Sequence, residues 1–400
     1  MSRDIVVIGI QPWDIEIGSN CKNIAEEMAK NNRVLYVNSP IHRLTALKDK
    51  KSPSVAKRLS VIKGETKSIN KVADNIWELN PPVVVEPINR ISFNPLFDYL
   101  NRINSKRFAK QINIAIDELG FKDYILFNDS SMFLGFYFDE FLNYDTYIYY
   151  IRDNLIKSIN PYWNTQGERI EAGIIKKADL VVTNSLYYSQ YASKFTEHSY
   201  MVGQGCDTEL FNDKIRDISI PDDLTNIPKP IIGYVGFLTA KRLSTDIIMH
   251  MAMSHPEWSI VLVGPEDEHF KKSKLHDIKN VHFLGSRNPD DLPNYIKGFD
   301  ICINPQVVNN ATIGNYPRKV DEYLAMGKPI IATKTVAMEY FGEHTYLGDT
   351  KEDYVTLTEK ALQENSEELM QSRHEYALSH SWETNVKEIW NAMKKINKQL

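Results

Sequence analysis

The stretch that decides the fold is TIGNYPRKVDEYLAMGKPIIAT, residues 312–333. Its order of residue types predicts a loop, a helix, a sharp stop and a short buried strand. Asn315 can cap the helix and Pro317 suits its first turn, while Gly327, followed by a lysine and a proline, ends it. The apolar run at 330–332 then predicts a strand inside a sheet.

Charge is concentrated where this helix begins. Lys319 and Glu322 are three residues apart, so both side chains lie on one face near the start of the helix. A helix N-terminus with a cation binds phosphate, and a carboxylate one turn later can accept hydrogen bonds from a ribose diol. The stretch therefore predicts a nucleotide site, although an ordinary surface helix with one ion pair has the same spacing.

Short apolar segments alternate with helix-like segments on both sides of this stretch. Such alternation is typical of doubly wound α/β domains with parallel sheets. The expected strands lie at 5–10, 33–38, 123–128, 147–151 and 179–184, and then at 231–235, 259–263, 281–284, 300–304 and 330–332.

The pattern weakens between 215 and 230, where Asp, Pro and Ile are frequent, and this break indicates a linker. We expect an N-terminal Rossmann-like domain over 1–205 on the acceptor side and a second one over 206–380, with the linker at about 212–230. Residues 381–400 are expected to form a last helix with one apolar stripe.

Bulk composition excludes several classes of protein. The chain has 400 residues, of which 42% are hydrophobic and 25% charged, as in ordinary globular proteins of two or three domains. The net charge of −5 gives no argument for a nucleic-acid partner. Three scattered cysteines form neither a disulfide framework nor a zinc pattern. No apolar run is long enough to span a membrane, and the N-terminus lacks a signal-peptide pattern, so we expect a cytoplasmic protein.

Glycines end three of the strands expected in the second half of the chain. After Gly236, the next turn carries Lys241 and Arg242, whose charges could offset a pyrophosphate close to the backbone. Two further strands end at Gly264 and Gly285, where the backbone can come close to a planar base. Taken alone, the two cations would also suit a solvated surface turn.

In the first half, polar residues follow the strands. Asp129 and Asp153 each come after a strand, where groups facing an acceptor would lie. A long loop at 11–20 contains Gly18, which also fits a plain N-cap for the following helix. The Gly-x-Gly-x-x-Gly spacing of dinucleotide sites is absent, so neither NAD nor FAD is expected. No His/Cys cluster or Asp-x-Asp motif suggests a metal, and no cofactor is expected.

The string PRKVDEYLAMGKP at 317–329 resembles the donor site of GT-B glycosyltransferases of the family-4-like (group 1) type, particularly those of teichuronic-acid and exopolysaccharide biosynthesis. The resemblance covers most of residues 140–345. It implies an α/β fold of two Rossmann-like domains facing across a cleft, with a C-terminal helix that crosses back to the first. This chain departs from the family pattern at Gly314, where an acid is usual, and at Phe237, where a basic residue is frequent.

The resemblance also assigns roles to individual residues. It implies transfer with retention of configuration, with Arg242 and Lys319 at the pyrophosphate and Glu322 at the donor ribose as the catalytic set. Gly18, Asp129 and Asp153 would face the acceptor. The donor-binding set would comprise Gly236, Lys241, Gly264, Gly285, Ser286, Arg287, Asn315, Tyr316, Pro317 and Arg318, with Ser286 and Arg287 near the base.

The expected partners are therefore a nucleotide sugar, with UDP or GDP as the nucleotide, and a glycan or lipid-linked acceptor. Eight Lys or Arg residues against two acids at 43–67, and five more at 90–110, suggest peripheral contact with the inner face of a membrane, or else a solvated charged face. Two alternatives to a glycosyltransferase stay open: a nucleotide-sugar 2-epimerase on the same fold, and a catalytically silent nucleotide-sugar-binding subunit.

Overall fold

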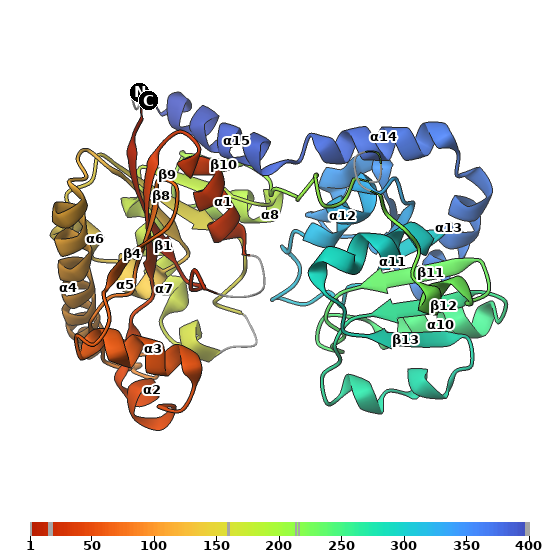
Figure 1. Cartoon of the computed structure of the whole chain (residues 1–400), viewed down its shortest axis with the longest axis horizontal. Helices are drawn as coiled ribbons and strands as arrows, with labels where there is room; N and C mark the ends of the chain where they lie inside the picture. The colour runs from red at the N-terminus through yellow and green to blue at the C-terminus, as the bar shows by residue number, and fades with distance from the viewer. Residues whose placement is uncertain (1, 15–18, 158–160, 213, 215–216, 397–400) are drawn as a thin grey trace. The chain divides into compact units, whose positions relative to one another are not determined.

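The computed structural model describes residues 2–14, 19–157, 161–212, 214 and 217–396. The chain forms two compact units (Figure 1). The first contains Met1–Gly203 together with Asn385–Leu400, and the second contains Gln204–Thr384. The last helix, α15 (Trp382–Lys395), therefore begins in the second unit and ends in the first.

The first unit is built on an eight-stranded sheet whose order is β10-β9-β8-β7-β1-β2-β5-β4. All neighbouring strands are parallel except β4 and β5, which are antiparallel. A separate pair, β3 with β6, is also parallel. The strands are β1 (Asp4–Gly9), β2 (Arg33–Asn38), β3 (Ile41–His42), β4 (Ile69–Ala73), β5 (Ile76–Leu79), β6 (Val84–Val85), β7 (Ile125–Asp129), β8 (Thr146–Ile151), β9 (Leu180–Thr183) and β10 (Ser199–Met201).

Apolar side chains of α4 and α7 pack with alternate residues of the central strands in one core cluster of this unit. The central strands β1, β7 and β8 are buried at every position, as expected for parallel strands covered on both faces. The helices are α1 (Asn20–Ala29), α2 (Arg43–Lys48), α3 (Pro53–Ile62), α4 (Asn94–Leu119), α5 (Met132–Gly135), α6 (Phe138–Phe141), α7 (Gly167–Lys177) and α8 (Leu186–Ala192).

The second unit has a six-stranded parallel sheet in the order β13-β12-β11-β14-β15-β16. Ile231 and Val235 of β11 pack into one core cluster, and Ile232 and Tyr234 into another, because successive side chains point to opposite faces. The elements are α9 (Asp222–Thr225), β11 (Ile231–Val235), α10 (Thr245–Ser254), β12 (Ser259–Val263), β13 (Val281–Gly285), α11 (Leu292–Gly298), β14 (Ile301–Asn304), α12 (Arg318–Ala325), β15 (Ile330–Thr333), β16 (Tyr346–Gly348), α13 (Lys351–Glu364) and α14 (Glu367–Leu378).

Residues 312–333 fold as the predicted helix and strand, but the prediction for the start of the helix was wrong. Helix α12 begins at Arg318, and its cap position is taken by Pro317 with no side-chain hydrogen bond. Asn315 therefore does not cap the helix, which is a correction. Gly327 adopts a φ of +68°, the left-handed conformation that ends helices. The expected linker contains the short helix α9, and residues 213, 215 and 216 lie outside the described residues.

Strand order reverses beside the first strand of each sheet. Strand β1 lies between β2 and β7, and β11 lies between β12 and β14. Ligands of open α/β sheets bind beyond the carboxyl ends of the strands at such reversals. Over the part of the chain that is described, no helix is both long and apolar enough to cross a bilayer.

Candidate functional site

Three glycines lie side by side at the carboxyl edge of the second sheet. The amide of Gly236 donates to the carbonyl of Val263 at 2.9 Å, and the amide of Gly264 donates to the carbonyl of Gly285 at 2.8 Å. A Cβ atom on Gly264 would lie 2.0 Å from the carbonyl oxygen of Gly236, and Gly264 has a φ of +146°. Only glycine fits at this position, and the three predicted glycines leave an edge of bare backbone.

Lys319 lies over this edge. It projects from the first turn of α12, and its Nζ donates to the hydroxyl of Tyr234 and lies 3.9 Å from the centre of the same ring. A Cβ atom on Gly236 would be 2.8 Å from Nζ. Helix α12 is itself attached to β11, because the amide of Val235 donates to the hydroxyl of Tyr323 at 2.8 Å. The structure thus places a cation and a helix N-terminus at the strand reversal, which is a site suited to phosphate.

Glu322 lies one turn further along α12 and is mostly buried, with 13% of its side chain exposed. Its Oε1 accepts from Nε of Arg318 at 3.0 Å, an i,i+4 pair. Burial raises the pKa of this carboxyl, although Arg318 and Lys319 act against that rise. The carboxylate is therefore positioned by Arg318, at i,i+4 spacing, rather than by Lys319, the i,i+3 partner that was expected.

Arg242 and Lys241 lie on an exposed turn after Gly236. The backbone of this turn is fixed, because the amide of Arg242 donates to Thr239 at 3.0 Å and its carbonyl accepts from Val307 at 2.8 Å. Among the described residues, neither cation has a carboxylate within ion-pair distance. Their charges are available to an anionic ligand.

Three other residues of the predicted donor-binding set, of which Ser286 and Arg287 were predicted near the base, have different surroundings. Ser286 is exposed. Arg287 donates from Nη2 to Asp223 of α9 at 2.5 Å and lies over the ring of Tyr295, 5.4 Å from its centre. Tyr316 is buried, with its ring 5.2 Å from that of Phe341. Contacts of Ser286, Arg287 and Tyr316 with a donor stay predictions.

A buried contact between Asp321 of α12 and His380 was not predicted from the sequence. Asp321 lies between Lys319 and Glu322 in the sequence but is fully buried. Its Oδ1 lies 2.7 Å from Nδ1 of His380. Burial raises the pKa of Asp321, while the contact with His380 lowers it. The two residues are 59 positions apart, and no motif connects them. The one signal in the sequence is that Asp321 is an acidic residue among the apolar residues of the buried face of the helix.

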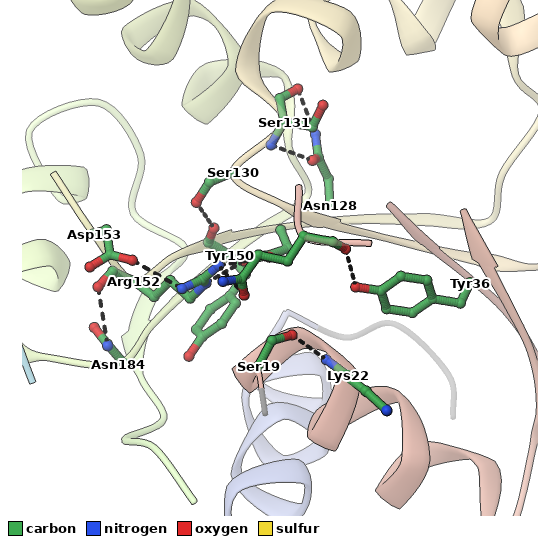
Figure 2. Close-up of polar contacts among 12 residues, drawn as sticks. Ser19, Lys22, Tyr36, Asn128, Ser130, Ser131, Tyr150, Arg152, Asp153 and Asn184 are labelled. Carbon is green, nitrogen blue, oxygen red and sulfur yellow. Dashed lines mark hydrogen bonds and ion pairs between the residues drawn. The ribbon is translucent and has the colours of Figure 1, made fainter. Parts of the chain in front are cut away.

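In the first unit, polar side chains from several strand ends converge on Arg152 (Figure 2). Its Nε donates to the fully buried Asp129 at 2.9 Å, and its Nη1 donates to Asp153 at 3.0 Å. Its Nη2 also donates to Gln11 at 3.3 Å, and its carbonyl accepts from Asn184 at 3.2 Å. The structure therefore brings together two of the predicted acceptor-side residues, Asp129 and Asp153, around a guanidinium that had not been assigned a role.

The two carboxylates beside Arg152 favour its charged form. Burial acts to lower the pKa of Arg152, but Asp129 and Asp153 together raise it above its ordinary value. The side chain of Asp153 is 39% exposed and can meet a ligand, whereas Asp129 cannot without movement. Gly18, the third predicted acceptor-side residue, lies outside the described residues. The next residue, Ser19, caps α1 by accepting from the amide of Lys22 at 3.2 Å.

Two other features of the described residues bear on the chemistry. No group of three or more His, Cys, Asp or Glu side chains among them could hold a metal ion. Hollows of about 570 and 510 Å³ both include Gly327 in their lining; the larger lies near the amino ends of β11 and β15, and the smaller is lined mainly by α14. The larger one is at the opposite edge of the sheet from the glycine row, and Lys328, which lines it, donates to the carbonyls of Lys297 and Phe299. We do not assign the site to them.

Residues 229–364 match the family of glycosyl transferases group 1. Over 225 residues the chain is 29% identical to TuaH of Bacillus subtilis, a glycosyltransferase named for teichuronic acid biosynthesis. That match covers 53% of this chain and 56% of TuaH, so it spans about half of each protein.

Solved structures match over nearly the whole chain. The sucrose-phosphate synthase of Thermosynechococcus elongatus is 14% identical with a TM-score of 0.69, and the match covers 99% of each chain. Anabaena HepE in complex with UDP is 13% identical with a TM-score of 0.66, covering 99% of this chain and 100% of that one. At this level of identity these structures show the fold alone, and they confirm the two Rossmann-like domains expected. Residues 229–364 thus match the group 1 glycosyltransferase family, and the chain has the GT-B fold.

Proposed function

We propose that this protein transfers a sugar from a nucleoside diphosphate sugar to an acceptor hydroxyl, with retention of configuration and without a metal. The observation that carries the proposal is the ammonium of Lys319 beside Gly236, at one end of the row that Gly264 and Gly285 continue. A diphosphate can lie against bare backbone there, under a cation and at the start of a helix. The ribose then falls near Glu322, one turn along α12.

In the proposed reaction, the cations of the donor site act by electrostatic stabilisation. Breaking the bond between the sugar and the diphosphate leaves negative charge on the leaving phosphate oxygen. Fixed cations at that oxygen stabilise the charge as it develops, and they need no metal to do so. Lys319 and Arg242 would supply this stabilisation, while Glu322 accepts from the ribose hydroxyls. Asp153 in the first unit would face the acceptor.

UDP is the nucleotide we propose first, because HepE, which shares this fold, was solved with UDP. The acceptor we propose is a glycan or a lipid-linked glycan of a cell-surface polysaccharide, in line with the name of TuaH. A nucleotide-sugar-binding subunit without transfer activity is the second candidate, because Gly314 stands where the family has an acid near the sugar.

We also propose cytoplasmic placement with peripheral contact to an anionic membrane surface. Large apolar side chains are exposed on α2 and around the start of α4, among the basic residues of 43–67 and 90–110. They are Leu44, Leu47, Phe93, Leu96 and Tyr99. Flotation with vesicles containing anionic lipid should carry the protein upward at low salt. Equal flotation with neutral vesicles would contradict the proposal.

The decisive experiment combines binding with transfer. Thermal shifts are measured with UDP, GDP, ADP and dTDP sugars, since a ligand of the folded state raises its stability. Arg242→Ala and Glu322→Ala should abolish transfer while the proteins stay folded, and Lys279→Ala, an exposed lysine away from the glycine row, serves as control. Near-normal turnover in either site variant would overturn the assignment. Donor binding without transfer or donor hydrolysis in the unmodified protein would favour the binding subunit.

A further inference from the structure

We propose that Tyr234 is a positioning residue for Lys319 and sets the affinity of the site for the diphosphate. Its ring and hydroxyl hold the ammonium at the carboxyl end of β11. This inference deepens the proposed function and rests on it. No motif pointed to Tyr234, which reads in sequence as one more apolar residue of a buried strand.

One side chain makes two contacts with the cation. The ammonium lies 3.9 Å from the centre of the Tyr234 ring, well within the range of a cation–π interaction, and it also donates to the hydroxyl. The ring is only 4% exposed and packs in the core cluster with Ile232, Ile248 and Leu262. Because the core fixes the ring, the ring can fix the ammonium.

Gly236 completes the arrangement. It lies two residues after Tyr234, and a Cβ atom there would be 2.8 Å from Nζ of Lys319 and 3.1 Å from the Tyr234 hydroxyl. A side chain at this position would displace the ammonium. Tyr234, Gly236 and Lys319 therefore act as one unit, with the cation held above an open backbone.

A neutral partner matters for anion binding. A carboxylate in place of the tyrosine would hold Lys319 as firmly, but it would cancel the charge that the diphosphate needs. The phenol leaves the full positive charge in place and uses one of the three ammonium donors, so two remain for phosphate oxygens. Glu322, the nearby acid, is already paired with Arg318. An unrestrained lysine would instead lose side-chain freedom on binding, which weakens affinity.

The test compares two substitutions and two ligands. Tyr234→Phe keeps the ring and removes the hydroxyl, whereas Tyr234→Leu removes both contacts. Titration calorimetry is run with whichever of UDP, GDP, ADP and dTDP binds the unmodified protein, and with the matching nucleoside, which has no phosphate. We expect diphosphate binding to weaken about 5-fold in Tyr234→Phe and about 20-fold in Tyr234→Leu. Binding of the nucleoside should change less than about twofold.

The matched control is Tyr346→Leu, because Tyr346 also lies beside a lysine, Lys360, at 5.9 Å, but on α13 and β16 rather than at the glycine row. This variant should bind the nucleoside diphosphate and the nucleoside with the same affinities as the unmodified protein. In a Lys319→Ala background, Tyr234→Phe should have no further effect on diphosphate binding. If Tyr234→Leu does not fold, the inference is tested by Tyr234→Phe alone and by the comparison of Tyr234→Phe with and without Lys319→Ala.

Three outcomes would overturn the inference. Equal weakening of diphosphate and nucleoside would make Tyr234 a packing residue only. An undiminished effect of Tyr234→Phe without Lys319 would show that the tyrosine acts elsewhere. Failure of the unmodified protein to bind any of the four nucleoside diphosphates would refute the proposed function, and this inference with it, a result distinct from the other two.

Discussion

Glu171 should make the first unit less stable as the pH rises from about 4.5 to about 7. The residue lies on α7, is 4% exposed, and accepts from the hydroxyl of Tyr149 at 3.2 Å. Burial raises its pKa from 4.5 to about 7, although hydrogen bonds from Tyr191 and Tyr149 act in the opposite direction. The carboxyl is therefore favoured in its protonated form in the folded protein.

The sign and size follow from linkage. Between about 4.5 and about 7, the folded state binds a proton that the unfolded state has released, so the free energy of unfolding falls as the pH rises. The stabilisation is complete below 4.5 and is lost above 7. Each unit of difference between the pKa values in the folded and unfolded states is worth about 1.4 kcal/mol, so the rise from 4.5 to about 7 corresponds to about 3 kcal/mol of unfolding free energy.

Glu171→Gln isolates the effect, because glutamine keeps an oxygen for Tyr149 and carries no charge at any pH. At pH 5 the variant should be more stable than the unmodified protein by less than about 1 kcal/mol, and at pH 8 by about 3 kcal/mol. Urea unfolding at several pH values measures the gap, with hydrogen exchange of the α7 peptide assigning the transition to the first unit.

Glu168→Gln is the control, since Glu168 lies on the same helix but is 70% exposed and, among the described residues, forms its ion pair with Lys157 at the surface. It should shift stability by less than about 0.5 kcal/mol at every pH, as exposed ion pairs do. A gap for Glu171→Gln that stays constant between pH 5 and pH 8, or that grows toward low pH, would refute the reasoning.

Three further predictions concern the sites. Gly264→Ala should abolish nucleotide binding in a thermal-shift assay and lower stability by more than about 2 kcal/mol, because its Cβ would meet a neighbouring backbone oxygen at 2.0 Å. Asp129→Ala should cost about 3–5 kcal/mol in urea unfolding by leaving the buried Arg152 without its closest partner, and a loss below about 1 kcal/mol would contradict the pairing. His380→Ala should lower the free energy of unfolding by about 3 kcal/mol, because the buried Asp321 would lose the ring nitrogen that lies 2.7 Å from its Oδ1, and Asp321→Asn in that background should restore part of the loss in urea unfolding.

Most of the strands were predictable because parallel strands covered on both faces are almost continuously apolar. Strands β1, β7, β11 and β12 are of this kind. Most of the strands that sequence reasoning did not find lie at sheet edges or have only two residues, and the exception is β5, a four-residue strand between β2 and β4. Strand β4, for example, has the sequence INKVA and alternates irregularly between half-buried and exposed side chains. Its place in the sheet depends on the antiparallel neighbour β5 rather than on its own pattern.

The site was predictable to the extent that it depends on the backbone. Glycines at the ends of three strands must meet at one edge once the strands are parallel, and Gly236 and Gly264 do. Partners of side chains were not predictable in this way. The side-chain rotamers decide whether Glu322 pairs with Lys319 or Arg318. Lys319 contacts the ring and hydroxyl of Tyr234 instead of Glu322. The Asn315 cap failed because the proline at 317 holds the chain extended just before the helix.

The placement of Lys319 and Glu322 depends on α12 residues that no donor would touch. Successive residues of a helix point about 100° apart, so neighbours of the two charged residues must point into the protein. Asp321 points to His380 and Tyr323 to the backbone of β11. These two buried contacts fix the rotation of α12 about its own axis. Because Lys319 and Glu322 turn with the helix, removing either contact should misplace the donor groups without touching the ligand. Affinity for the nucleotide is thus a property of the core under α12 as well as of the charges above it.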